Sequence, residues 1–278
     1  MAYHAEISRS NPACILFLID QSGSMADPWS GGREKNKSDE LALIINRLLR
    51  ELCISSARAE GVRDYFNVGV IGYGSQVGPA FSGPLAGREM VPISEVALSP
   101  DRVEDIIKKT EDGAGGIVDQ TIRLPIWFDP VSSGGTPMCQ ALGHAYSITE
   151  RWLAKNQNSF PPIVINITDG ESTDGDPVAA ASRIRELANN DGNVLLFNIH
   201  ISAQGGEPEM FPDDEQQLRD EFARTLFLMS SPLPESMIAQ ARREGFKVSG
   251  SSRGFVFNSD IIGVIRFLEI GTKPSNLR

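Results

Sequence analysis

The segment FLIDQSGSM places three oxygen-bearing side chains two residues apart at the end of an apolar run. These side chains belong to Asp20, Ser22 and Ser24. One carboxylate and two hydroxyls are hard oxygen ligands of the kind that bind Mg²⁺ or Mn²⁺. The same residue types are also common in turns, where their side chains bond to backbone amides nearby. The choice between a metal site and a capped turn therefore depends on whether other segments supply further ligands.

Two other segments carry matching oxygen donors. SSGGTPM places Thr136 just before a helical pattern, and ITDGEST places Asp169 at the end of an apolar strand pattern. Taken alone, Thr136 would be interpreted as a helix cap and Asp169 as part of an Asp-Gly turn. Together the three segments offer two carboxylates and three hydroxyls, a set that suits Mg²⁺ because this ion is held through few carboxylates and keeps several waters. We expect Mg²⁺ as the cofactor, with Mn²⁺ or Ca²⁺ as alternatives.

The elements that must position these donors are apolar strand patterns alternating with amphipathic helical patterns. Strands are expected at 14–20, 65–73, 162–169, 194–202 and 254–258, and helices at 39–59, 136–155, 176–190, 235–244 and 259–270. This alternation predicts an α/β fold, with a Rossmann-like open, mostly parallel central sheet flanked by helices on both faces. In such sheets ligands bind beyond the carboxyl ends of the strands, and Asp20 and Asp169 both stand at such ends.

The chain reads as a single domain over 1–278 with two additions. The first, at about 74–135, is rich in Gly, Pro and Ser, and we expect one helix in it at 100–110. The stretches EDGAGGIVDQ and LPIWFDP, which follow that helix, are interpreted as loops or an irregular hairpin. The second addition is an extension at about 203–232.

Through these motifs the sequence resembles the von Willebrand factor A (VWA) domain family, from about residue 14 to the closing helix. The residues that resemble this family are DQSGSM, the loop threonine of GGTP and the strand-end aspartate of TDG, in that order. The resemblance implies a VWA fold and a metal-ion-dependent adhesion site (MIDAS) made of Asp20, Ser22, Ser24, Thr136 and Asp169. It further implies that Ser22 and Ser24 are direct ligands, and that Asp20, Thr136 and Asp169 act directly or through water, depending on whether a partner is bound. In that family a partner protein's Glu or Asp often supplies the last ligand.

Both additions depart from a minimal domain of this family and could cover the metal face and set partner choice. Trp29 follows the DQSGSM loop and Trp127 lies in the first addition. An aromatic side chain in an exposed loop is a candidate partner contact, so both tryptophans are partner-binding candidates. A packing role is the alternative for either tryptophan.

Composition restricts the partners and the compartment. The formal net charge of −10 argues against nucleic acid or an anionic membrane surface as the main partner. The three cysteines form no CxxC pair, which disfavours a disulfide framework or a zinc cluster and favours a reducing compartment. The first apolar run is too short and too late for a signal peptide, and no apolar run is long enough to span a membrane. We expect a cytoplasmic protein.

These observations favour a non-enzymatic adaptor, which the resemblance would place in a bacterial stress-response or regulatory complex. The GxSxG match GSSRG precedes a short strand pattern, and no histidine follows it to complete a hydrolase triad. The glycine-rich stretch at 113–116 lacks the lysine of a phosphate-binding loop. Two alternatives stay open: a Mg²⁺-dependent phosphoester hydrolase, and a domain in which the metal is purely structural.

Overall fold

The structure of the protein is a computed structural model, which describes residues 3–29, 36–111, 117–201, 208–218, 221–259 and Phe267. Its main feature is a central β-sheet. Strands follow the order β11-β12-β10-β9-β1-β4-β5, and β6 pairs with β4. Their bounds are β1 Ala13–Asp20, β4 Phe66–Tyr73, β5 Val77–Pro79, β6 Val91–Pro92, β9 Ile163–Thr168, β10 Leu195–Ile201, β11 Glu209–Met210 and β12 Phe255–Ser259. The inner pairs are parallel, and β5, β6 and β11 pair antiparallel.

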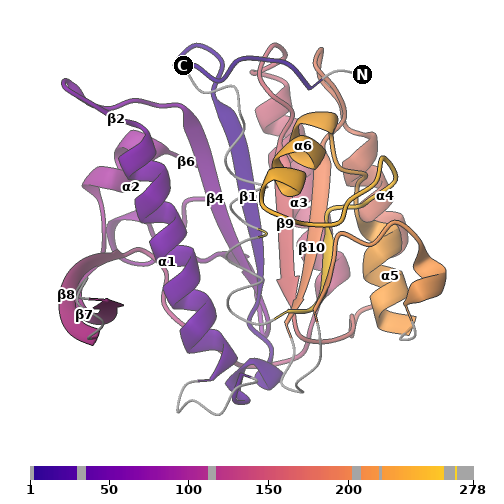
Figure 1. The fold of residues 1–278 in the computed structure, drawn as a ribbon, viewed down its shortest axis with the longest axis horizontal. Coiled ribbons are helices and arrows are strands. Elements are labelled where there is room, and N and C mark those ends of the chain that lie inside the picture. The colour runs from indigo at the N-terminus through magenta and orange to yellow at the C-terminus, as the bar shows by residue number, and fades with distance from the viewer. Residues whose placement is uncertain are drawn as a thin grey trace.

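Helices cover both faces of this sheet (Figure 1). Their bounds are α1 Lys37–Ser55, α2 Ile93–Leu98, α3 Met138–Leu153, α4 Val178–Glu186, α5 Glu221–Met229 and α6 Glu235–Arg243. Alternate residues of β1 enter opposite cores: Ile15 and Phe17 pack with α1, α2 and α6, whereas Leu16 and Leu18 pack with α3, α4 and α5. A strand buried on both faces is expected to be apolar throughout. The predicted α/β class, with an open and mostly parallel sheet, is confirmed.

The sheet reverses its winding direction beside β1. The chain runs from β1 through α1 to β4 on one side, and it later returns to β9 on the other side of β1. The carboxyl ends of β1 and β9 therefore flank a topological switch point, which is where open α/β sheets bind ligands. Asp20 ends β1, and Asp169 directly follows β9.

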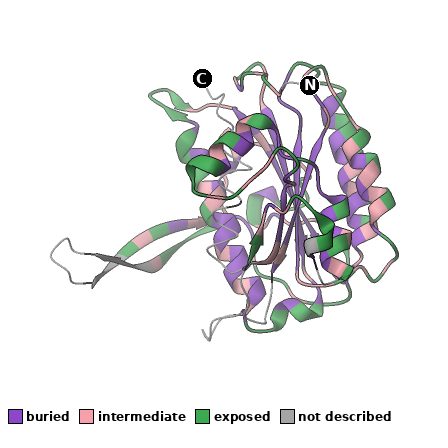
Figure 2. Cartoon of the chain, turned by 45° about the vertical axis from the view of Figure 1, so that its right-hand side comes forward, coloured by how far each residue is buried: buried purple, intermediate pink, exposed green. Residues whose placement is uncertain are grey.

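The helix predicted at 100–110 is wrong. This stretch forms the strand β7, Arg102–Glu111, which pairs antiparallel with β8, Ile117–Ile126. The segment IVDQTIRL in β8 contains four β-branched residues, and cross-strand pairing with it overrides the helical pattern of β7. The two strands form a ribbon that projects from the body of the molecule (Figure 2). The stretches EDGAGGIVDQ and LPIWFDP, predicted as loops or an irregular hairpin, contribute to one strand of this ribbon, and the other strand is the stretch predicted as a helix. Residues 112–116 lie outside the described part of the chain.

The remaining predicted elements lie close to the observed ones. The extension at 203–232 contains β11, the 3-10 helix η3 (Glu215–Gln217) and α5. Most of the closing helix expected at 259–270 lies outside the described residues, although Phe267 is buried and stacks on Phe211. Among the helices that the structure describes, none is both long and apolar enough to cross a lipid bilayer.

Candidate metal centre

Asp20 anchors the candidate centre at the end of β1. Its side chain is 1% exposed, and its two carboxylate oxygens have separate partners. Oδ1 accepts a hydrogen bond of 2.8 Å from the backbone N–H of Ser22, and Oδ2 accepts one of 2.7 Å from the hydroxyl of Thr168. The carboxylate thereby fixes the turn that leads from β1 into the 3-10 helix η1, Gly23–Ala26.

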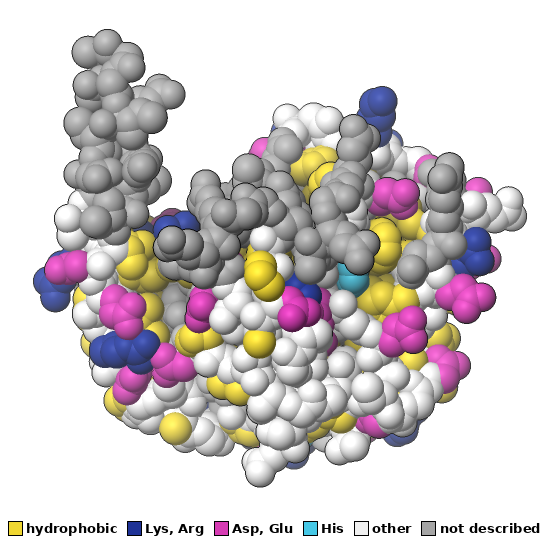
Figure 3. Space-filling model, turned by 90° about the horizontal axis from the view of Figure 1, so that it is seen from below, with side chains coloured by type: hydrophobic (Ala, Val, Ile, Leu, Met, Phe, Trp, Pro, Cys, Tyr) yellow, Lys and Arg dark blue, Asp and Glu magenta, His cyan; other side chains and the backbone are white. Residues whose placement is uncertain are grey.

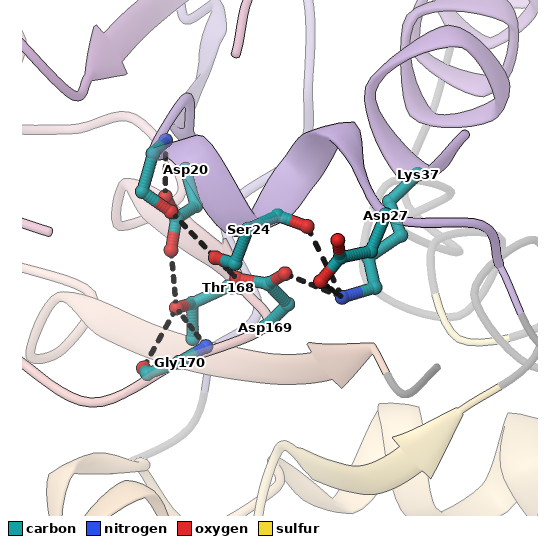
Figure 4. Close-up of polar contacts among 8 residues, drawn as sticks. Asp20, Ser24, Asp27, Lys37, Thr168, Asp169 and Gly170 are labelled. Atoms are coloured by element: carbon teal, nitrogen blue, oxygen red, sulfur yellow. Dashed lines mark hydrogen bonds and ion pairs between the residues drawn. The ribbon is translucent and has the colours of Figure 1, made fainter. Parts of the chain in front are cut away.

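The two serines connect this turn to the loop after β9. The hydroxyls of Ser22 and Ser24 lie 3.0 Å apart, and Ser24 donates a hydrogen bond of 2.7 Å to Oδ1 of Asp169 (Figure 4). Four of the five predicted ligand residues, Asp20 among them, are thus joined through one hydrogen-bonded chain from two loops. The sequence separation of 145 residues between Ser24 and Asp169 shows that the fold, not local turn chemistry, assembles the cluster.

Backbone hydrogen bonds fasten the GGTP loop to the first loop. Gly23 donates to the carbonyl of Gly134 at 3.0 Å, and Ser133 donates to the carbonyl of Gln21 at 2.7 Å. Gly134 has φ +82°, and a Cβ there would lie 2.5 Å from the backbone nitrogen of Ser75. Both observations require glycine at this position. Gly134 is therefore what allows this loop to approach the segment that follows β4 so closely.

Thr136 is buried, with 5% exposure, and lies beside the Asp169 loop. Its backbone N–H donates to the hydroxyl of Thr173 at 2.9 Å, and its carbonyl accepts from the N–H of Thr173 at 2.9 Å. A Cβ built on Gly170 would lie 3.9 Å from the Thr136 hydroxyl oxygen, so this hydroxyl lies next to the residue that follows Asp169. The three predicted loops therefore meet at one end of the sheet.

Lys37, at the first position of α1, belongs to the same cluster, although the sequence motifs do not predict it. Its ammonium nitrogen lies 2.7 Å from Oδ2 of Asp169, 3.3 Å from the carbonyl oxygen of Ser24 and 3.8 Å from Oδ2 of Asp27. A lysine in the first helical turn opposes the helix dipole, so a nearby counter-charge is needed. A lysine at the start of a predicted helix was therefore the feature of the sequence that could have indicated a nearby carboxylate.

The donor chemistry of this cluster fits one hard divalent cation. Among the described residues, no three His, Cys, Asp or Glu side chains converge as metal ligands. The cluster instead offers two carboxylates, from Asp20 and Asp169, with serine and threonine hydroxyls around them. Oxygen ligands with few carboxylates suit Mg²⁺ better than a transition metal that prefers nitrogen or sulfur.

Burial raises the pKa of Asp20 from its ordinary value of 3.8 to about 6, and the charge of Asp169 adds to this rise. Hydrogen bonds from Ser22 and Thr168 act in the opposite direction. A buried carboxylate with a raised pKa is one whose charge lacks compensation. A cation placed against it would favour the ionised form, which is the electrostatic condition for a metal ligand.

We expect the stability of Asp20→Asn relative to wild type, both free of metal, to rise as the pH rises from about 4 to about 6. Because the pKa of Asp20 is higher in the folded state, the folded protein holds more protons than the unfolded chain between pH 3.8 and about 6. The free energy of unfolding contributed by Asp20 therefore falls as pH rises through this window. The asparagine removes this loss, so its advantage grows with pH to at most about 3 kcal/mol.

Urea unfolding of both proteins in EDTA, from pH 4.5 to 7.5, measures this difference. Other titrating groups are common to both proteins and cancel in the comparison. An advantage of Asp20→Asn that stays constant over the whole range would contradict the assignment of the effect to Asp20.

The prediction that Trp29 and Trp127 contact a partner is wrong for this structure. The two side chains are 3% and 1% exposed and belong to the core between the sheet and α1. The indole nitrogen of Trp127 donates a hydrogen bond of 2.7 Å to the carbonyl of Val96. The packing alternative therefore holds, because an indole that is fully covered by its own chain cannot contact a partner.

The end of the molecule that carries the centre has mixed charge. Figure 3 looks onto this end, where acidic and basic side chains are interspersed among those drawn in colour. Ser24 and Asp27 are exposed here, whereas Asp20 and Lys37 are buried. Ser24 is therefore the proposed ligand residue that is exposed at this end of the molecule.

The comparisons give structural likenesses at low identity. No family model and no curated protein matches the sequence. The vWF domain of the type V pili tip protein Mfa5 from Porphyromonas gingivalis is similar at 15% identity with a TM-score of 0.33, covering 59% of this chain and 39% of that one. The ArnB paralog VWA2 from Sulfolobus acidocaldarius is similar at 13% identity with a TM-score of 0.36, covering 68% of this chain and 35% of that one.

The PilB minor pilin from Streptococcus sanguinis is similar at 10% identity with a TM-score of 0.45, covering 94% of this chain and 61% of that one. This chain therefore spans less than two thirds of the length of each of these three structures. Two of the three are VWA-type domains by name, which is the family that the sequence motifs resemble.

Proposed function

We propose that this chain is a divalent-metal-dependent protein-binding module. In this proposal Mg²⁺ is held by Asp20, Ser22, Ser24, Thr136 and Asp169, and it binds a Glu or Asp carboxylate from a partner protein. The supporting observation is the hydrogen-bonded chain from Asp20 through Ser22 and Ser24 to Asp169 at the switch point of the sheet.

The chemistry of the cluster favours binding over catalysis. Hydroxyls and two carboxylates leave coordination positions for water and for one outside oxygen. A hydrolase with two bridged metal ions would need more carboxylates than this cluster provides. We therefore propose that the module is not an enzyme and that it acts as a cytoplasmic adaptor in a bacterial regulatory or stress-response complex.

Metal binding requires a local exchange of hydrogen bonds. Ser24 now donates to Oδ1 of Asp169 at 2.7 Å, and this bond occupies one of the carboxylate oxygens that a metal would use. Ser24 and Asp169 would both hold the ion in this proposal, and their hydrogen bond would then be lost. The exchange needs no movement of β1 or β9, because both residues lie in the loops that follow these strands.

Ser22→Ala is expected to weaken Mg²⁺ binding by about tenfold to 100-fold and to remove Mg²⁺-dependent partner capture. Loss of residues that merely support a metal ligand already has effects of this size. Isothermal titration measures the metal affinity, and co-purification from the native cell with Mg²⁺ or with EDTA measures partner capture. Ser147→Ala, which changes an exposed serine on α3, is the matched control.

The outcomes separate the three functional alternatives. Capture that persists in EDTA would contradict the proposal. Metal binding that raises the melting temperature without any metal-dependent capture would favour the structural alternative. Metal-dependent release of phosphate from phosphate esters, lost in Ser22→Ala, would favour the hydrolase.

A further inference from the structure

The two carboxylate oxygens of Asp169 have different partners. Oδ1 accepts the hydroxyl of Ser24 at 2.7 Å, and Oδ2 accepts the ammonium group of Lys37 at 2.7 Å. The side chains of this ion pair are 0% and 4% exposed, for Asp169 and Lys37 respectively. Figure 4 shows Lys37 on the side of Asp169 that faces away from Asp20. The ammonium group therefore leaves free the side of Asp169 on which the other proposed ligands lie.

The backbone holds Lys37 in this place. The side chain of Asn36 accepts the N–H of Asp39 at 2.8 Å, which caps α1 immediately before Lys37. The N–H of Lys37 itself donates to the carbonyl of Asp27 at 3.0 Å. Since a cation at a helix N-terminus is unfavourable in itself, the contact with Asp169 is what stabilises the lysine there.

Lys37 changes the charge of the centre. Asp20 and Asp169 carry two negative charges when ionised, and Lys37 reduces the sum to one. A divalent ion then makes the loaded centre positive by one unit, whereas the same ligands without the lysine would give a neutral centre. In a buried site with little solvent screening, one unit of charge alters the affinity for every other charged species.

We propose that Lys37 sets the partner chemistry of the centre: it weakens metal binding and strengthens binding of an anionic oxygen ligand, such as a carboxylate, to the metal-loaded centre. This inference rests on the proposed function, since it concerns the same centre. Lys37 is a positioning residue, because it acts through its contact with Asp169 and through its charge, and does not itself contact the metal or the carboxylate of the partner. The centre is thereby selective for anionic over neutral oxygen ligands.

A simpler role would be competition, in which the ammonium occupies the place of the metal until the metal displaces it. Removing a competitor would strengthen metal binding and leave the affinity of the loaded centre for a carboxylate unchanged. Removing a fixed positive charge would strengthen metal binding and weaken the affinity of the loaded centre for a carboxylate. The opposite signs of the two changes therefore distinguish the two roles.

The test compares wild type with Lys37→Met, using Mn²⁺ alone as the metal probe and acetate as the carboxylate probe. Electron paramagnetic resonance of free Mn²⁺ gives the metal affinity. Water-proton relaxation of the Mn²⁺-loaded protein gives the affinity for acetate, which displaces bound water. We expect Lys37→Met to bind Mn²⁺ about tenfold more tightly and acetate about tenfold more weakly, as one unit charge near the site requires.

Two variants serve as controls, and a third keeps the test possible if Lys37→Met does not fold. Lys37→Arg keeps the charge and is expected to leave the affinities for Mn²⁺ and acetate within about threefold of wild type. Asp27→Asn changes an exposed carboxylate 3.8 Å from the same ammonium and is expected to have a smaller effect on both affinities. Lys37→Gln, which removes the charge but keeps a donor for Asp169, replaces Lys37→Met if needed.

Each outcome bears on a separate claim. If wild type binds no Mn²⁺, the proposed function fails and this inference fails with it. If wild type binds Mn²⁺ and the acetate affinity does not fall when the charge of Lys37 is removed, the inference fails and the metal centre stands. Opposite changes in the two affinities, reversed by Lys37→Arg, support the inference.

Discussion

Asn46→Ala is expected to lower the free energy of unfolding by about 3–5 kcal/mol. Asn46 lies on α1, is 2% exposed, and its amide group makes four hydrogen bonds. Oδ1 accepts the N–H groups of Trp127 and Phe128 at 2.8 and 3.1 Å, and Nδ2 donates to the carbonyls of Phe128 and Ala42 at 2.9 Å or less. Each buried backbone group left without a partner costs about 1–3 kcal/mol.

Urea unfolding of wild type and Asn46→Ala measures this effect. Asn190→Ala is the matched control, because Asn190 is exposed and its side chain bonds only to that of Asn158 among the described contacts. The control should change the free energy of unfolding by less than about 0.5 kcal/mol. Equal losses in the two variants would show that Asn46 does not connect α1 to the end of β8.

Asn46 also illustrates the kind of feature that a sequence pattern conceals. The helical period predicts α1 from the spacing of its apolar residues, and it places Asn46 on the buried side without explaining it. The explanation lies 81 residues away, at the segment that follows β8. Because that segment belongs to the first addition, whose fold the pattern does not determine, the contact could not be predicted.

The central sheet was predictable because its strands are buried on both faces. β1 and β9 read as continuous apolar runs, and such runs are typical of inner parallel strands. The stretch that forms β7 has no such signature. Its sequence, RVEDIIKKTE, mixes charged and apolar residues in a way that suits a helix or an exposed strand equally. Only pairing with β8 decides between the two.

The residues of the candidate centre also include some that could be predicted from the sequence and one that could not. Asp20, Ser22, Ser24 and Asp169 were found because oxygen donors at strand ends form a recognisable pattern, and the structure brings them together. Lys37 was not found, because no spacing rule relates a lysine at the start of a helix to an aspartate 132 residues away in the sequence.

Breaking the buried ion pair of Lys37 and Asp169 is expected to have the second large effect on stability. In EDTA, Asp169→Ala leaves the buried ammonium group of Lys37 with only the exposed carboxylate of Asp27, 3.8 Å away, and Lys37→Met leaves the buried carboxylate of Asp169 without its ammonium partner. Removing one partner of such a pair typically costs about 3–5 kcal/mol. The double variant removes both charges, and since apolar replacement of a buried pair is often neutral, we expect it to recover most of the loss.

A double-mutant cycle by urea unfolding in EDTA measures the coupling, which should exceed about 2 kcal/mol. Arg88 and Glu95 provide the matched control, since their contact is 2.8 Å long but their side chains are 46% and 40% exposed. Exposed pairs of this kind contribute less than about 1 kcal/mol, because water screens both charges. If the two cycles give the same coupling, Lys37 lies in water when the metal is absent. If the Lys37–Asp169 cycle is the larger, the loop after β9 already holds a cation before any metal arrives.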